Sequence, residues 1–473
     1  MRVVESRALL ARRLMYAGIA ALCAQASENA YANDTTYANL DGKAGSRNDE
    51  SAADQSAVPV TADPYAHFKQ YVSKSFNVPI PGPSAYIDPD PAGFRSALAD
   101  HGFGYWGYSL NAWTYDLQNS SKVDGQQVYV GQRPTLTSYN YLYGTYDLSR
   151  HGIENGQISA ALANVYTTWA AAGPNMTRIG VLQYYQTFGG GKVEMTVGNL
   201  ANSFTYVGIY VGGNLASGTF GVNASIPSQV GMSSTFLARP GANFKFNLGG
   251  GFYDMLGVQR SVNPDGAAVE QDHNKVGVEF GGDNVGKLYI NELGFRRSAA
   301  PGQADTWVRT GYFRNTSDFN SRKTPGTRDD GNYAAYLLAD RQLLSLADSS
   351  IQAARGIYAG FSVMHAPADL NTFTNYGEFR IYAKGLFDRR PNDMLSFVMT
   401  HTEFSDYAVD AARAAGSPTE NASSAVSLSY SGQVYRGITL TAGFSYIDHP
   451  RPVATSDEQD AGLNFQLGAH IYF

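Results

Sequence analysis

Cysteine is almost absent from this sequence of 473 residues. The one cysteine, Cys23, lies in an apolar run that we expect to be removed, so the mature chain should hold neither a disulfide nor a thiolate metal site. Basic blocks are missing too, because 35 Lys and Arg are scattered among 41 Asp and Glu. A mildly acidic chain of this kind binds nucleic acid poorly, so we expect no nucleic-acid partner.

After residue 26 the sequence also lacks any long apolar run, which excludes membrane-spanning helices but not membrane-spanning strands. A mean hydropathy of −0.27 fits a membrane β-barrel, since only alternate residues of such a barrel face lipid. Enzyme signatures are missing as well, with no Gly-x-Ser-x-Gly elbow and no His-Glu-x-x-His helix. We therefore expect neither catalysis nor a cofactor or metal.

The N-terminus has the features of an export signal. Arg7, Arg12 and Arg13 precede an apolar run over residues 14–24, and small-residue cleavage sites follow. We expect a signal peptide over 1–32. Residues 33–92 should form a disordered, proline-rich extension with a short helix, and residues 93–473 the main domain.

The last eleven residues alternate strictly between apolar and polar or small side chains. One face of the expected strand carries Leu463, Phe465, Leu467, Ala469, Ile471 and the terminal Phe473. Such an amphipathic strand closes a transmembrane barrel, although for this segment alone a soluble sandwich is the alternative. The same period of two recurs over residues 106–113, 243–248, 275–280, 378–384 and 437–444.

These patterns predict an all-β fold, a transmembrane antiparallel β-barrel with a short helical and disordered N-terminal extension. At roughly 22 residues per strand and turn, the main domain holds about 16 strands, with about 18 as the alternative. Residues 200–240 fit the strand rhythm badly. We interpret them as a loop folded into the lumen, or alternatively as an ordinary extracellular loop or irregular strand pair.

Charged residues within the strand pattern are expected to face the lumen, because a charge facing lipid near the midplane costs about 2–4 kcal/mol. Mixed charges and aromatic rings could contact sugar hydroxyls and ring faces, whereas the alternative is that the charges only pair along the wall. The pore-lining candidates, to which the ring of Tyr115 is added, are Trp113, Arg178, Glu194, Lys245, Lys275, Glu279, Arg309, Glu378, Arg380, Tyr382 and Lys384.

Four segments, over residues 94–103, 331–344, 385–395 and 446–450, give the sequence a family resemblance. They are similar to the first helix and strand, an inner strand, a turn and the end of carbohydrate-selective outer-membrane porins of the OprB type. The resemblance implies a sixteen-stranded porin of the bacterial outer membrane that passes small saccharides by passive diffusion. A general or acid-selective porin, a barrel enzyme and a secreted lectin are the alternatives.

The resemblance also implies partners. Phe473 should present the sorting signal to the barrel-assembly machinery, and the outward face should contact outer-membrane lipid and lipopolysaccharide. By analogy we expect a monomer, with a trimer as the alternative.

Overall fold

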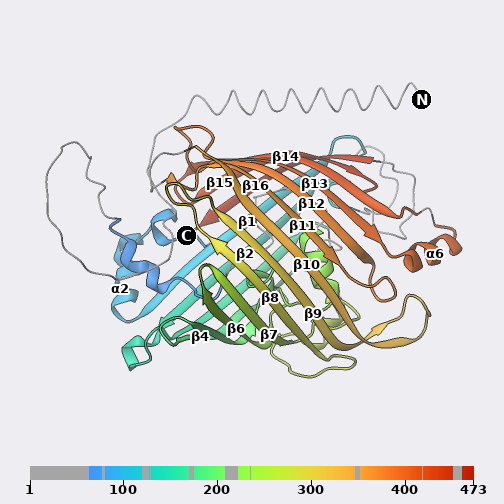
Figure 1. Ribbon diagram of the computed structural model, residues 1–473, viewed down its shortest axis with the longest axis horizontal. Helices are drawn as coiled ribbons and strands as arrows, with labels where there is room; N and C mark the ends of the chain where they lie inside the picture. Colours follow the sequence, from blue (N-terminus) through green and yellow to red (C-terminus); the bar gives the residue numbers. More distant parts are fainter. Residues whose placement is uncertain are drawn as a thin grey trace.

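The computed structural model describes residues 63–76, 80–119, 127, 129–169, 175–207, 222–234, 236–346, 352–417, 419–450 and 461–473. The expected signal peptide and residues 33–62 lie outside these residues. Within them, sixteen antiparallel strands form one closed barrel, each strand pairing with its neighbours in sequence and β1 with β16 (Figure 1). This confirms the predicted fold and strand number.

The strands are long enough to cross a membrane as tilted β-strands. Their bounds are β1 (Phe103–Asp116), β2 (Thr135–Asp147), β3 (Gln157–Thr167), β4 (Met176–Phe188), β5 (Val193–Leu200), β6 (Arg239–Gly249), β7 (Phe252–Arg260), β8 (Lys287–Arg297), β9 (Thr306–Asn320), β10 (Arg328–Ser345), β11 (Gly356–His365), β12 (Phe373–Lys384), β13 (Met394–Phe404), β14 (Ala422–Tyr435), β15 (Ile438–Asp448) and β16 (Ala461–Tyr472).

Within the described residues, the helices lie in the connections between strands and in the segment before β1. The α-helices are α2 (Phe94–Asp100), α4 (Val222–Gln229), α5 (Ala267–His273) and α6 (Asp406–Ala414), and the short 3-10 helices are η1 (Ala66–Tyr71), η2 (Pro83–Ala85), η3 (Pro91–Gly93), η5 (Leu148–His151) and η7 (Asn202–Phe204). None of the helices in the described part of the chain is long and apolar enough to cross a membrane.

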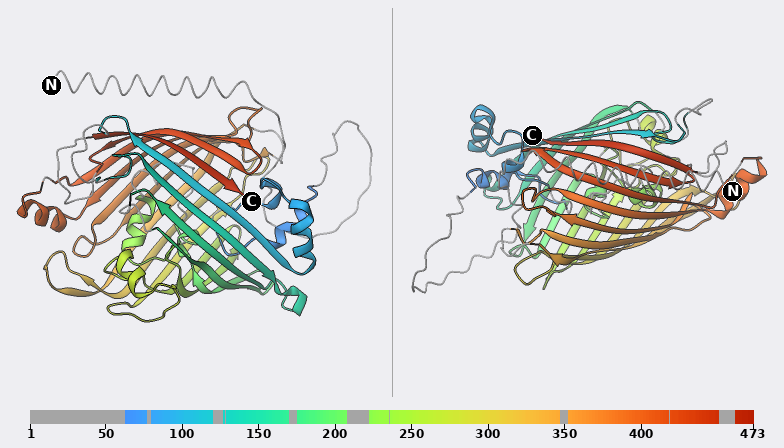
Figure 2. Two further views of the ribbon diagram at one scale, coloured as in Figure 1. Left: turned by 180° about the vertical axis from the view of Figure 1, so that it is seen from behind. Right: turned by 90° about the horizontal axis from the view of Figure 1, so that it is seen from above.

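The two ends of the barrel differ in the length of their connections. The end that carries α2 and the C-terminus has short turns, down to residues 250–251 and 436–437, whereas the end that carries α6 has connections as long as residues 201–238 and 261–286 (Figures 1 and 2). We call these the α2 end and the α6 end.

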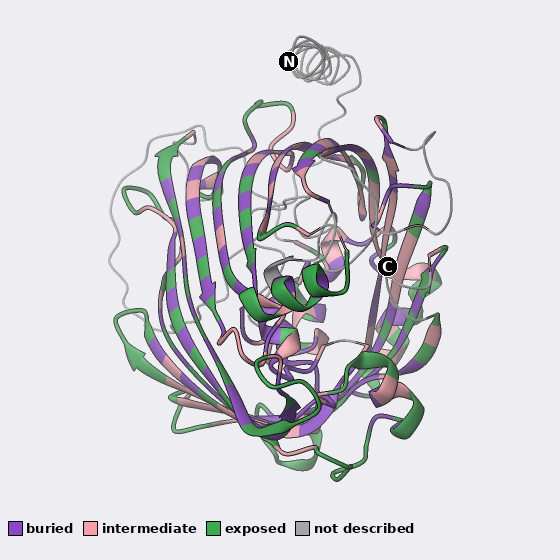
Figure 3. Ribbon diagram, turned by 90° about the vertical axis from the view of Figure 1, so that its right-hand side faces the viewer, coloured by how far each residue is buried: buried purple, intermediate pink, exposed green. Residues whose placement is uncertain are grey.

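Side chains alternate across the wall as the period of two predicts. In β3, Ile158, Leu162 and Tyr166 point outward and are exposed, while Ser159 and Ala163 point inward and are buried. Figure 3 shows this alternation of buried and exposed residues along successive strands. In a membrane barrel the apolar outward face meets lipid.

The extension before β1 closes part of the α2 end. Helix α2, within the stretch expected to match the family's first helix, is fixed by Arg95, which is only 3 % exposed. Its guanidinium lies 4.0 Å from the centre of the Tyr105 ring and donates to the Pro89 carbonyl at 2.6 Å. At the start of the helix, Ser96 donates to the Asp90 carboxylate, and this hydrogen bond lowers the pKa of Asp90.

One strand predicted from the sequence is wrong. Residues 275–280 do not form a strand but belong to the loop after α5. The side chain of Asn274 accepts the Gly277 backbone N–H at 2.9 Å, and Gly277 has a φ of 86°. This turn breaks the extended conformation that the alternation of Val276 and Val278 suggested.

Phe313, on the inward face of β9, tests whether packing inside the lumen stabilises the barrel. Its side chain is 1 % exposed within a cluster of buried residues. We expect Phe313→Ala to lower the free energy of unfolding by about 3–5 kcal/mol, because it leaves a cavity. Thermal unfolding followed by the mobility shift of the heated barrel in electrophoresis measures the loss.

Phe361→Ala is the matched control for this prediction. Phe361 lies on the outward face of β11 and is 41 % exposed, so lipid fills the space that the ring leaves. An equal loss of stability in the two variants would contradict a structural core within the lumen.

Candidate functional site

The connection between β5 and β6 folds into the lumen. Its residues Tyr206, Ile226 and Met232 are buried in one hydrophobic cluster with inward side chains from β7 to β12. The side chain of Asn202 anchors its start, since it donates to Gln259 at 2.8 Å. This confirms that part of residues 200–240 enters the barrel, and the segment therefore narrows the lumen from one side.

A second segment enters the lumen from the α2 end. Trp106 Nε1 donates to the Ser73 hydroxyl at 3.0 Å, and the backbone N–H of Lys74 donates to Gln157 at 3.0 Å. The ring of Phe76 then packs edge-on against Phe204 of the first segment, with centroids 5.3 Å apart. The two narrowing segments thus meet at this pair of rings.

Beside this contact lies a small polar hollow in the wall, which we call the Glu194 hollow. Glu194 and Lys245 face each other with 3.5 Å between carboxylate and ammonium, and both remain about a quarter exposed. Tyr185 donates to Glu194 at 2.9 Å. The hollow has a volume of about 60 Å³ and is also lined by Ser75, Phe76 and Thr205. It has room for a few water molecules or the hydroxyl edge of a solute.

The wall opposite this hollow carries hydroxyl groups instead of charges. In the closed ring of sixteen strands, β14 is half a circumference from β6. Inward residues there include Ser427 and Ser445, whose hydroxyls lie 2.5 Å apart, and Ser431 and Thr441, whose hydroxyls lie 2.7 Å apart. We call these four residues the hydroxyl wall. Ser427, Ser445 and Thr441 are at most 5 % exposed and Ser431 is half-buried, so this wall offers few groups to a solute. Strict alternation of serine with apolar residues in β14 was the signal that the sequence analysis missed.

Arg380, Glu378 and Tyr382 lie on the inward face of β12, as expected, but they are packed together. Arg380 is 1 % exposed and bridges Asp340 at 2.5 Å and Glu378 at 2.6 Å. Tyr382 donates to Asp340 at 3.0 Å. Such a buried cluster, in which one arginine lies between two carboxylates, holds strands β10 to β12 together and offers few groups to a solute.

Two further predicted residues are buried in the same way. Arg309 lies 3.7 Å from the centre of the Trp307 ring and is 1 % exposed. Arg178, near the α6 end, donates to the Asn274 carbonyl at 3.0 Å. Both side chains face inward as expected and are packed into the barrel wall. Lys384 is half-buried at the α2 end, with its ammonium 4.6 Å from the centre of the Tyr358 ring.

Three predicted positions are not inward residues of a strand. Trp113 lies on the outward face of β1, since its register partner Leu136 also points outward. Its ring stacks on that of Tyr115, with 5.7 Å between the ring centres. Lys275 and Glu279 are exposed residues of the loop after α5. For these three residues the expectation of an inward, strand-borne side chain is wrong.

An ionic cluster near the α6 end was missed. Glu270 of α5 lies 2.9 Å from both Arg239 and Arg260, and all three side chains are buried. Arg239 begins β6 and Arg260 ends β7, so neither arginine falls within an alternating segment that the sequence displays. In the described part of the chain, no group of three or more His, Cys, Asp and Glu could hold a metal ion.

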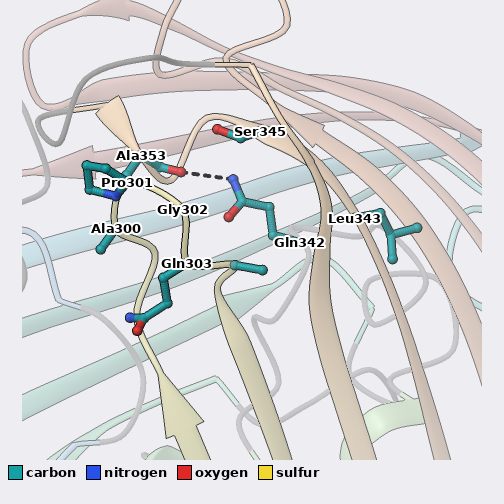
Figure 4. Close-up of a pocket in the computed structure, with 9 residues that line it drawn as sticks. Ala300, Pro301, Gly302, Gln303, Gln342, Leu343, Ser345 and Ala353 are labelled. Atoms are coloured by element: carbon teal, nitrogen blue, oxygen red, sulfur yellow. Dashed lines mark hydrogen bonds between the residues drawn. The ribbon is translucent and has the colours of Figure 1, made fainter.

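A second hollow contains none of the charged lumen residues. It measures about 310 Å³ and lies at the α2 end between the turns after β8 and β10 (Figure 4). Its lining includes Pro301, Gln303, Gln342 and Ser345, and Gln342 already donates to the Ala353 carbonyl at 2.9 Å. No ionisable side chain lines it, so we do not place the solute path there.

A closed sixteen-stranded barrel with a polar interior, narrowed by segments that fold inward, defines the class of diffusion porins. The family of carbohydrate-selective porins, the OprB family, matches residues 140–467. This covers more than half of the chain, and the chain therefore belongs to that family. The predicted resemblance and the predicted function, a porin for passive sugar diffusion, are confirmed, and the family and fold are those of non-enzymatic channels.

Solved structures agree on the fold. The high-pH structure of OprB from Pseudomonas putida has a TM-score of 0.69 at 15 % identity and is matched over 82 % of this chain and 98 % of that chain. Its low-pH structure has a TM-score of 0.51 at 13 % identity over the same shares. No match was found among curated protein sequences.

Substitution of Arg380 tests whether its cluster stabilises the barrel wall or lines the pore. We expect Arg380→Met to lower the free energy of unfolding by about 3–5 kcal/mol, because Asp340 and Glu378 would remain buried without a counter-charge. Single-channel conductance in planar bilayers should stay unchanged, since the cluster is closed to solvent.

Arg328→Met is the control for Arg380→Met. It breaks an ion pair with Asp265 whose side chains are 30 % and 28 % exposed, and such pairs contribute about 0–1 kcal/mol. A large change of conductance with unchanged stability in Arg380→Met would show that Arg380 lines the water path.

Proposed function

We propose that small saccharides diffuse passively through this barrel across the bacterial outer membrane, passing the Glu194 hollow. The single observation that carries the proposal is the mixture of groups at the hollow. A carboxylate, an ammonium and phenol rings lie at the point where both narrowing segments meet. Sugar hydroxyls both donate and accept, so they suit a site that offers both kinds of partner.

The proposed orientation follows from the connections. Outer-membrane barrels have short periplasmic turns and long extracellular loops. We therefore assign the α2 end to the periplasm and the α6 end to the outside. Solutes would pass the loops at the α6 end first and then the narrowing at Phe76 and Phe204. Outer-membrane lipid and lipopolysaccharide would surround the apolar band, and terminal Phe473 would have guided assembly.

The arrangement of charges in the lumen supports passage of neutral solutes and argues against a strong filter for ions of one sign. Lys245 is paired with Glu194, and Arg380 is paired with Glu378 and Asp340. Paired charges of both signs give a weak net field along the path.

The Glu194 hollow is tested by the block of ion current during sugar titration in planar bilayers. We expect the double variant Glu194→Gln, Lys245→Met to raise the half-saturating glucose concentration about fivefold. A net hydrogen bond contributes about 1 kcal/mol, which corresponds to about this factor. Open-channel current without sugar should change little, because the two charges cancel.

Asp265→Asn is the matched control, since it breaks an ion pair of similar exposure at the outer rim. It should leave the half-saturating concentration unchanged. An unchanged value in the double variant would remove the hollow from the sugar path. Absence of any current block in the wild-type protein would instead favour a general diffusion porin.

A further inference from the structure

Residues 71–76, which precede the barrel in sequence, lie against its inward wall, and we call them the docked segment. Gln157 of β3 donates to the Val72 carbonyl at 3.1 Å and accepts the backbone N–H of Lys74 at 3.0 Å. Gln183 of β4 donates to the Lys74 carbonyl at 3.3 Å. Side chains of the wall therefore supply the backbone partners that a helix or strand would otherwise give this segment.

The first two strands of the wall are shaped to receive the docked segment. A Cβ at Gly104 of β1 would lie 2.4 Å from the Tyr71 side chain and 2.8 Å from its carbonyl oxygen, so a larger residue there would push the segment away. The Thr145 hydroxyl of β2 donates to the same Tyr71 carbonyl at 2.5 Å. With the hydrogen bond from Trp106 to Ser73, inward residues of four successive strands hold the segment in the lumen.

The backbone of the docked segment turns sharply at Ser75. Its φ is 88°, in the left-handed region, and such a conformation costs a residue other than glycine about 1–3 kcal/mol. Gln183 donates to the Ser75 hydroxyl at 2.8 Å and so helps to hold this turn. The wall therefore fixes the conformation that directs the next residue, Phe76.

Phe76 is the most accessible ring of a small aromatic cluster. It packs edge-on against Tyr143 of the wall at 6.0 Å and against Phe204 of the β5–β6 connection at 5.3 Å, measured between ring centres. Those two rings are 1 % and 2 % exposed, whereas Phe76 is half-buried. Phe76 also lines the Glu194 hollow. A solute at the hollow would therefore meet this ring.

The two sides of the narrowing differ in chemistry. Glu194 and Lys245 offer hydrogen-bonding groups to a solute, whereas the ring of Phe76 offers only bulk. An apolar ring excludes a solute by its shape, because it has no donor or acceptor that could replace the hydration of the solute. Binding and exclusion by size can thus belong to different residues at the same place.

We propose that Phe76, positioned by the docked segment, sets the upper size of the solutes that pass this pore. The inference rests on the proposed function, since it concerns passage beside the Glu194 hollow. It assigns the size limit to a residue that lies before the barrel in sequence and enters from the α2 end. The limit should apply to every uncharged solute, whatever its hydrogen-bonding groups.

Exclusion of neutral polymers of graded mass measures this limit on the full mature chain. Poly(ethylene glycol) that enters the pore lowers its single-channel conductance in planar bilayers, whereas an excluded polymer does not. We expect Phe76→Ala to shift the smallest excluded polymer to a larger mass, and Phe76→Tyr to keep the wild-type limit. Phe94→Ala is the matched control, because this ring of α2 is 56 % exposed and contacts the outward ring of Tyr105.

The polymer experiment separates this inference from the proposed function. An unchanged limit in Phe76→Ala, with the heat-dependent mobility shift retained, would overturn the role of Phe76. A shift of the same size in Phe94→Ala would overturn it as well. Polymer exclusion does not depend on sugar binding, so a wild-type channel without sugar block would contradict the proposed function and leave this test intact.

Thiol modification gives a second readout that leaves Phe76 in place. Cys23 is the only cysteine in the sequence and lies in the expected signal peptide, so one introduced thiol is unique. A bulky neutral methanethiosulfonate added to Ser75→Cys should lower the single-channel current, since residue 75 lines the Glu194 hollow. Ser149→Cys, at an exposed turn of the α2 end, should show no change. An unchanged current after modification of Ser75→Cys would contradict a docked segment beside the solute path.

Discussion

Closure of the hydrogen-bonded ladder between β1 and β16 is the constraint on which the rest of the structure depends. Lipid offers no partner to a free strand edge, so only a closed barrel can cross a membrane with strands. Gly107 exchanges both backbone hydrogen bonds with Phe473, at 2.8 and 3.0 Å. A Cβ at Gly107 would come within 2.4 Å of the Phe473 ring, so glycine is required where the terminal aromatic closes the seam.

Closure fixes the side-chain phase of every strand, and this phase separates two kinds of chemistry. Outward residues supply the apolar band. Inward residues must fill or line a lumen, and here much of the lumen is filled. The segment after β5 buries Tyr206 and Ile226 against β7 to β12, and the N-terminal segment places Phe76 against Phe204. The proposed path of a solute lies beside the Glu194 hollow.

The length of the main domain predicted the strand number. Period-two patterns sufficed to predict the barrel and the inward phase of Arg178, Glu194, Lys245, Arg309 and the residues of β12, because a charge facing lipid is costly. These patterns failed at Lys275 and Glu279, where a local turn replaced the expected strand. They also failed at Trp113, because a shift of one residue moves a side chain to the other face of a strand. They could not show that Arg380 would be neutralised by Asp340, forty positions earlier in sequence, since such pairing follows from register. The roles of the pore-lining candidates in sugar passage stay predictions.

Liposome swelling with the purified wild-type protein tests the central claim most directly. The rates for glucose and a disaccharide are compared with those for an amino acid and a zwitterion of matched size. The account predicts faster permeation of the sugars, because the paired charges of the Glu194 hollow lie beside the narrowing. Equal rates for all solutes of one size would contradict selectivity for carbohydrates, and absence of swelling with every solute would contradict an open pore.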